Sequence, residues 1–89
     1  MASTEAKLND LELKVYDLIR LKGWEGKTCD EIEAETGLTH QSASARVSEL
    51  ENRHKLIERR SIRRKTRAGR QARVYVVKGL PEAAKRIDA

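Results

Sequence analysis

The residues of this chain best suited to chemistry form a dense polycation. Residues 59–73 contain seven arginines and one lysine with no acidic residue among them. Such a basic patch is the electrostatic footprint of a polyanion partner. A solvated loop, or a localisation tag in a eukaryotic host, is the alternative interpretation. The candidate anion-binding residues of this segment are Arg59, Arg60, Arg63, Arg64, Lys65, Arg67, Arg70 and Arg73.

The charge of the whole chain is unevenly distributed along its length. The net charge is +5, but residues 1–45 sum to −4 and residues 46–89 sum to +9.

Aromatic residues are few, namely Tyr16, Trp24 and Tyr75. Stacking on single-stranded bases, which needs aromatic platforms, is therefore poorly provided for.

Other chemistries find little support in the sequence. The separations of Cys29, His40 and His54 match no pattern of paired zinc ligands. There is no glycine-rich phosphate loop, and no Ser/His/Asp arrangement has a supporting spacing. Cys29 stands near a helix N-terminus, which can lower a thiol pKa, but a passive cysteine is favoured. We therefore expect no enzyme, no metal and no cofactor. The acids of residues 30–35 are expected on a solvated helix face, and His54 is expected to cap a helix end.

The length and composition restrict the class of protein. Eighty-nine residues allow one domain with a modest core, and they exclude a barrel enzyme or a doubly wound cofactor fold. No apolar run approaches the ~20 residues of a membrane span, and residues 1–7 hold no apolar signal-peptide region. A single cysteine indicates a reducing compartment. We expect a cytoplasmic protein without a membrane partner, with a disordered tail (1–7), a domain (8–78) and a C-terminal extension (79–89).

Three helices are predicted before the basic segment. The first spans residues 9–22, where Asn9 and Glu12 form a capping box. Its apolar stripe is expected at Leu11, Val15 and Leu18, with Ile19 at the edge. The second begins at Thr28 with another capping box, buries Ile32 and ends at Gly37. The third spans residues 40–53 behind Thr39 as its cap, and its inward stripe is Ala43, Val47 and Leu50.

The hydrophobic period then changes to that of strands. Residues 56–62 and 71–77 are predicted to pair as a hairpin, connected by residues 63–70. A hairpin alone is marginal in water, so it should pack on the helices. The apolar residues available for that contact are Leu56, Ile57, Val74 and Val76. Pro81 could open a short last helix over residues 82–87. The expected fold class is mainly α with a small β-hairpin, in the order α-α-α-β-β.

Residues 28–50 carry a known pattern. Its matching positions are Thr28, Glu31, Ile32, Gly37, Leu38, Thr39, Ala43, Ser44, Arg46, Val47 and Leu50. In these residues the segment resembles the helix-turn-helix of winged-helix DNA-binding proteins. Leu56-Ile57-Glu58-Arg59 is similar to the family's entry into the wing, and Arg70 followed by Val74-Tyr75-Val76 is similar to the exit. The resemblance covers about residues 8–78. Ala43 is smaller than the usual residue, and residues 52–55 lack the glycine common before the first wing strand.

The resemblance implies a winged helix-turn-helix fold and a bacterial, archaeal or phage cytosolic setting. It also implies that helix 40–53 enters the major groove and that the basic wing 59–73 lies on the backbone or minor groove. If about six of its eight cations meet phosphates, log affinity should fall with log salt at a slope near ~−5.

The side chains on the outer face of helix 40–53 suit the major groove of DNA, independently of the resemblance. Helical geometry places Gln41, Ala45 and Ser48 opposite the buried stripe, and such small side chains let a backbone approach base edges. A solvated face is the alternative, but such faces are normally rich in Glu and Lys. The candidate DNA-contacting residues are Thr39, His40, Gln41, Ser42, Ser44, Ala45, Arg46 and Ser48.

The sequence thus predicts a sequence-specific protein that binds double-stranded DNA and regulates transcription. Two alternatives stay open: a phage or plasmid replication or recombination accessory protein of low sequence specificity, and a winged-helix protein-interaction module. A monomer and a weak homodimer are both compatible, with Leu13 and Tyr16 either exposed or in a dimer seam. Trp24 is expected in the core under the hairpin, with a partner anchor as the alternative.

Overall fold

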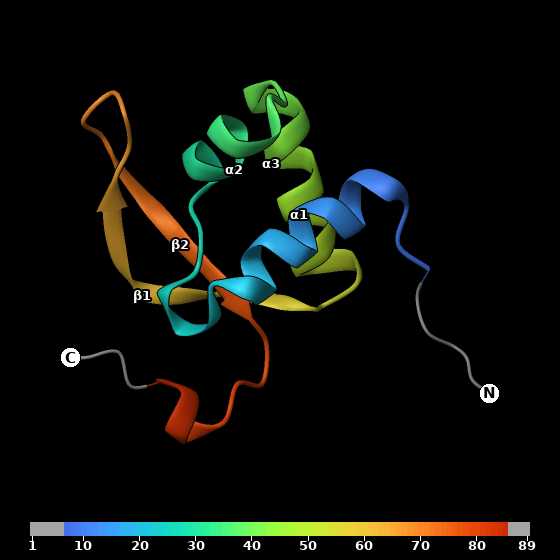
Figure 1. Ribbon diagram of the computed structural model, residues 1–89, viewed down its shortest axis with the longest axis vertical. Helices are drawn as coiled ribbons and strands as arrows, with labels where there is room; N and C mark the ends of the chain where they lie inside the picture. Colours follow the sequence, from blue (N-terminus) through green and yellow to red (C-terminus); the bar gives the residue numbers. More distant parts are fainter. Residues whose placement is uncertain (1–6, 86–89) are drawn as a thin grey trace.

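The computed structural model describes residues 7–85 of the chain (Figure 1). Three helices precede one antiparallel hairpin: α1 (Asp10–Leu21), α2 (Cys29–Thr36), α3 (His40–Ser48), β1 (Ile57–Lys65) and β2 (Gln71–Val77). Shorter turns follow α1, α3 and β2, namely η1 (Gly23–Glu25), the π-helical η2 (Glu49–Arg53) and η3 (Glu82–Lys85). The expected order α-α-α-β-β is confirmed. The predicted tail, apart from Lys7, and the end of the predicted last helix lie outside the described residues.

Local hydrogen bonds set the start of the first two helices, as the sequence predicts. The Asn9 side chain accepts from the Glu12 N–H at 2.8 Å, and the Glu12 carboxylate accepts from the Asn9 N–H at 3.0 Å. Thr28 and Glu31 repeat this reciprocal pair at 3.1 and 3.0 Å. Gly37 ends α2 in the left-handed region at φ 78°. The cap at Thr28 therefore fixes where the acidic first turn of α2 begins.

The core lies among the three helices, η2 and the two strands of the hairpin. Its buried cluster consists of Val15, Ile19, Ile32, Ala43, Val47, Leu50, Ile57 and Tyr75. The predicted stripe of helix 40–53 is confirmed, since Ala43 and Val47 of α3 and Leu50 of η2 are all buried. The predicted stripe of α1 is partly wrong, because Leu11 is 37% exposed and Leu18 is only half-buried. The inward positions are instead Glu12, Val15 and Ile19.

Glu12 occupies an inward position because it has polar partners there. Its carboxylate caps Asn9 and lies 3.3 Å from His54 Nε2, and both side chains are buried. Three neighbours lower the Glu12 pKa from its ordinary value of 4.5: a side-chain hydrogen bond with Glu49, the hydrogen bond from the Asn9 N–H and the nearby His54. Burial of the carboxylate opposes this effect. His54 caps the end of η2, as expected, with its N–H donating to the Glu49 carbonyl at 2.9 Å, and its side chain joins this end to α1.

The hairpin is longer on β1 than predicted. The turn needs only residues 66–70, where the Thr66 N–H donates to the Arg70 carbonyl at 2.8 Å, so β1 continues to Lys65. Between the Arg59–Tyr75 and Arg63–Arg73 pairs, β1 advances four residues while β2 advances two. This bulge re-aims the side chains of β1 beyond it.

An isolated antiparallel β-bridge between Lys27 and Tyr75 joins the hairpin to the loop before α2. Lys27 donates its N–H to the Tyr75 carbonyl at 3.0 Å and accepts from the Tyr75 N–H at 2.9 Å. Gly26 makes this approach possible, because a Cβ there would lie 2.4 Å from the Tyr75 carbonyl oxygen. β2 therefore lies between Lys27 on one edge and β1 on the other.

The entry to β1 has a strained backbone. Lys55 has φ 56° and is the one non-glycine residue with positive φ within residues 7–85. This conformation costs a residue with a Cβ roughly 1 kcal/mol or more. The chain therefore makes a left-handed turn with lysine in the segment, residues 52–55, that lacks the glycine common in the family it resembles.

Candidate nucleic-acid interface

The start of α3 presents most of the side chains predicted to read DNA. Thr39, His40, Gln41 and Ser48 are exposed, and Ser42, Ser44, Ala45 and Arg46 are half-buried. The Thr39 hydroxyl accepts from the Ser42 N–H at 3.1 Å and so serves as the cap. The side chains of Gln41, Ser42 and Ser44 take no part in the hydrogen bonds that the described residues 7–85 make at this helix. The helix therefore keeps three polar side chains available to a ligand.

Three other predicted residues of α3 are bound to their own chain. His40 Nδ1 lies 2.8 Å from Glu33 Oε2. The Arg46 guanidinium donates twice to Glu49, at 2.9 and 3.0 Å. The Ser48 hydroxyl accepts from Asn52 at 3.3 Å. A partner would have to compete with these contacts.

Arg59 and Arg60 of β1 are also engaged within the chain. Arg59 Nε donates to Glu51 at 2.8 Å. Arg60 donates to the Trp24 carbonyl at 2.9 Å, and its guanidinium carbon lies 4.0 Å from the centre of the Trp24 ring. Trp24 thus lies under the hairpin, as expected, through a cation–π contact with Arg60 of β1. Its side chain is only half-buried, so the expectation that it belongs to the core is wrong.

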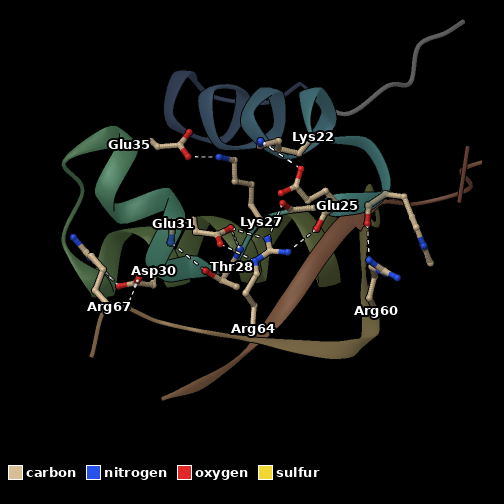
Figure 2. Close-up of polar contacts among 12 residues, drawn as sticks. Lys22, Glu25, Lys27, Thr28, Asp30, Glu31, Glu35, Arg60, Arg64 and Arg67 are labelled. Carbon is tan, nitrogen blue, oxygen red and sulfur yellow. Dashed lines mark hydrogen bonds and ion pairs between the residues drawn. The ribbon is translucent and has the colours of Figure 1, made fainter. Parts of the chain in front are cut away.

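Arg64 makes the most extensive contact of the hairpin (Figure 2). Its Nε and Nη2 donate to the two carboxylate oxygens of Glu31, both at 2.8 Å. The same guanidinium donates to the carbonyls of Glu25 and Gly26, at 3.1 and 3.0 Å. The hydrogen bonds from Arg64 hold the Glu31 pKa below its ordinary value of 4.5. One side chain thus joins β1, the loop before α2 and α2 itself.

Arg67, in the hairpin turn, contacts the same helix (Figure 2). Its Nε and its backbone N–H both donate to the Asp30 carboxylate, at 2.9 and 3.0 Å. Its Nη2 lies 3.6 Å from Glu33. These hydrogen bonds lower the Asp30 pKa from its ordinary value of 3.8. The expectation of a solvated acidic face on α2 is therefore wrong, since all four of its acids, Glu35 with Lys27 included, pair with side chains outside the helix.

The other four predicted cations of the hairpin lie outside this network. Arg63, Lys65, Arg70 and Arg73 are exposed and form no ion pair within the described part of the chain. Arg63 and Arg73 are direct cross-strand partners. Like charges directly opposite each other destabilise a strand pair, so fold stability does not account for this arrangement. The structure thus divides the basic segment into four held and four unpaired cations, a division that no local pattern in the sequence indicates.

The cysteine and the other titratable groups offer no second site. Burial, with a smaller effect of Glu33, raises the pKa of the Cys29 thiol to about 11. The lowered pKa that a helix N-terminus could cause is therefore not found, because desolvation outweighs it. Within residues 7–85 no group of three or more His, Cys, Asp or Glu side chains could hold a metal ion, and no helix is long and apolar enough to cross a membrane.

Comparisons with known proteins identify no relative of this chain. Neither a protein-family model, nor a curated protein, nor a solved structure matches the chain significantly. The interface must therefore be judged on its own geometry and charge.

Proposed function

We propose that this chain is a winged-helix protein that binds double-stranded DNA, with α3 and η2 along the major groove and the hairpin on the phosphate backbone. The order of elements and the short bridge from Lys27 to β2 support this fold. The expected biological role is transcription regulation in a prokaryotic or phage cytoplasm.

The observation that carries the proposal is the unpaired cation pair of the hairpin. Arg63 and Arg73 stand opposite each other in register without a carboxylate partner among residues 7–85. Guanidinium groups bind phosphate bidentately, and an array of phosphates would remove the repulsion between the two arginines. Lys65, two residues along the same strand, extends this surface.

The chemistry of α3 supports a groove rather than a protein partner. Its exposed start carries short polar side chains, and Gln41 can pair bidentately with adenine. Ala45 can contact a thymine methyl group. The Thr39 cap leaves the N-terminus of the helix toward solvent, where the dipole favours a phosphate.

A DNA-binding protein of low sequence specificity is the second candidate. Its support is that His40, Arg46 and Ser48 are already bonded within the chain. Few side chains of α3 would then remain for base contacts. Selection of bound duplexes from a random pool separates the two roles, because a defined motif indicates a regulator and featureless enrichment indicates an accessory protein.

Fluorescence anisotropy with a short duplex tests the binding itself. Four unpaired cations give an expected slope of log affinity against log salt of about −3.6 between about 50 and 200 mM salt, less steep than six contacts would give. R63Q/R73Q should make this slope shallower by about 1.8. K14Q removes an exposed cation of α1 and serves as the charge control. Absence of binding at low salt would refute the proposal.

A further inference from the structure

We infer that α2 holds Arg64 and Arg67 in a clasp that stays closed on DNA, so that only the opposite face of the hairpin contacts phosphate. The clasp consists of Arg64 with Glu31 and of Arg67 with Asp30. This inference rests on the proposed function and names the cations that serve it. It assigns Arg64 and Arg67, both expected from the sequence to bind DNA, to positioning the hairpin.

The bonding of Arg64 makes it a positioning residue. Its guanidinium satisfies two carboxylate oxygens and two backbone carbonyls at 2.8–3.1 Å. A phosphate could replace the carboxylate but would leave the carbonyls of Glu25 and Gly26 without this donor. Removal of Arg64 from the clasp would also leave Glu31 without its strongest partner. DNA therefore gains little by recruiting this side chain.

Arg67 is bound to Asp30 through both its backbone and its side chain. The turn itself, and not only a flexible side chain, is therefore docked on α2. Any phosphate approaching Arg67 would also meet the negative charges of Asp30 and Glu33, the second of which lies 3.6 Å from Arg67 Nη2. Charge repulsion thus disfavours a phosphate at the Arg67 side chain.

The strand register separates the clasp from the unpaired cations. Successive side chains of a strand point to opposite faces, so Arg63 and Lys65 lie on the face opposite to Arg64. Arg73 pairs with Arg63 and shares its face. Along β2 that face continues to Tyr75, which packs into the helical core.

The part of this face that carries the unpaired cations is exposed and lies beyond the part that packs on the helices at Tyr75. On β1 the same face carries Arg59, the partner of Tyr75, and Arg59 contacts Glu51 of η2, the continuation of α3. A duplex lying along α3 would then meet the unpaired cations next. The clasp keeps the hairpin in the orientation that makes these two surfaces continuous.

A charge-neutral double variant tests this inference. R67Q/D30N removes one charge of each sign, so the net charge of the protein is unchanged, whereas R63Q removes one cation from the opposite face. We expect the salt slope of R67Q/D30N to stay within about 0.3 of wild type and that of R63Q to become shallower by about 0.9. A slope for R67Q/D30N that becomes shallower as much as that of R63Q would overturn the inference. Absence of wild-type binding at low salt would overturn the proposed function and the inference with it.

A second measurement does not depend on any variant. The Nε–H resonances of Arg64 and Arg67 in ¹⁵N-labelled wild-type protein report their hydrogen bonds directly. We expect both resonances to keep their positions and their protection from exchange when duplex DNA is added. Movement or loss of the two resonances at saturation, with the Arg63 and Arg73 signals unchanged, would overturn the inference while leaving DNA binding intact.

Discussion

Gly26 is the position where the fold tolerates a side chain least. Its φ is +69°, and an added Cβ would lie 2.4 Å from the Tyr75 carbonyl oxygen and 2.8 Å from a Val74 methyl carbon. The nearest atom belongs to the backbone of β2 and cannot turn aside. Gly26→Ala must therefore displace the strand that Lys27 bridges.

The cost of that substitution follows from its parts. The left-handed conformation costs alanine about 1 kcal/mol. Weakening the two hydrogen bonds between Lys27 and Tyr75 adds about 1 kcal/mol for each, and overpacking adds about 1 kcal/mol more. We expect Gly26→Ala to lower the free energy of unfolding by about 3–4 kcal/mol.

Gly37→Ala is the matched control for this measurement. Gly37 also has positive φ, at +78°, but nothing lies within 4 Å of an added Cβ. Its substitution should therefore cost only the conformational part, about 1 kcal/mol. Urea denaturation followed by circular dichroism compares the two variants directly. A difference below about 1 kcal/mol between them would refute the close approach of Gly26 to β2 as a determinant of stability.

Three further predictions concern single residues. Lys55→Gly should raise the free energy of unfolding by about 0.5–1 kcal/mol, because glycine relieves the left-handed strain; a lower urea midpoint would contradict this. With its pKa at about 11, Cys29 should react with iodoacetamide near neutral pH roughly 100-fold more slowly in the folded than in the unfolded chain; equal rates would exclude thiol burial. Glu31 has a lowered pKa in the folded state, so its contribution to stability is complete above its unfolded pKa and is lost as pH falls through the folded pKa. E31Q keeps a capping-box partner and should weaken the dependence of the melting temperature on pH between about pH 5 and 3; an unchanged dependence would show that the Arg64–Glu31 pair does not contribute to stability.

The division of the basic segment changes how its charge should be interpreted. A count of eight cations overstates what a polyanion can reach, since Arg59, Arg60, Arg64 and Arg67 are held by groups of the same chain. The acidic half of the sequence supplies partners for two of them from α2. It thus orients the hairpin, in addition to lowering the net charge.

Local signals in the sequence determined the elements. The capping boxes at Asn9 and Thr28, the glycine after α2 and the inward stripe of α3 act over three or four residues, so their effect is legible without a tertiary structure. The order of helices and strands follows from these signals and from the change of hydrophobic period. The abundance of cations in residues 59–73 was visible in the same way.

Only the tertiary structure decided which charges remain available. Arg64 and Glu31 are 33 residues apart, and Arg67 and Asp30 are 37 apart, so no local pattern pairs them. The inward position of Glu12 likewise depends on His54, which arrives from the far end of η2. Burial and ion pairing depend on which segments meet in space, and this is the physical reason that the composition revealed a basic patch while the fold decided which of its cations remain unpaired.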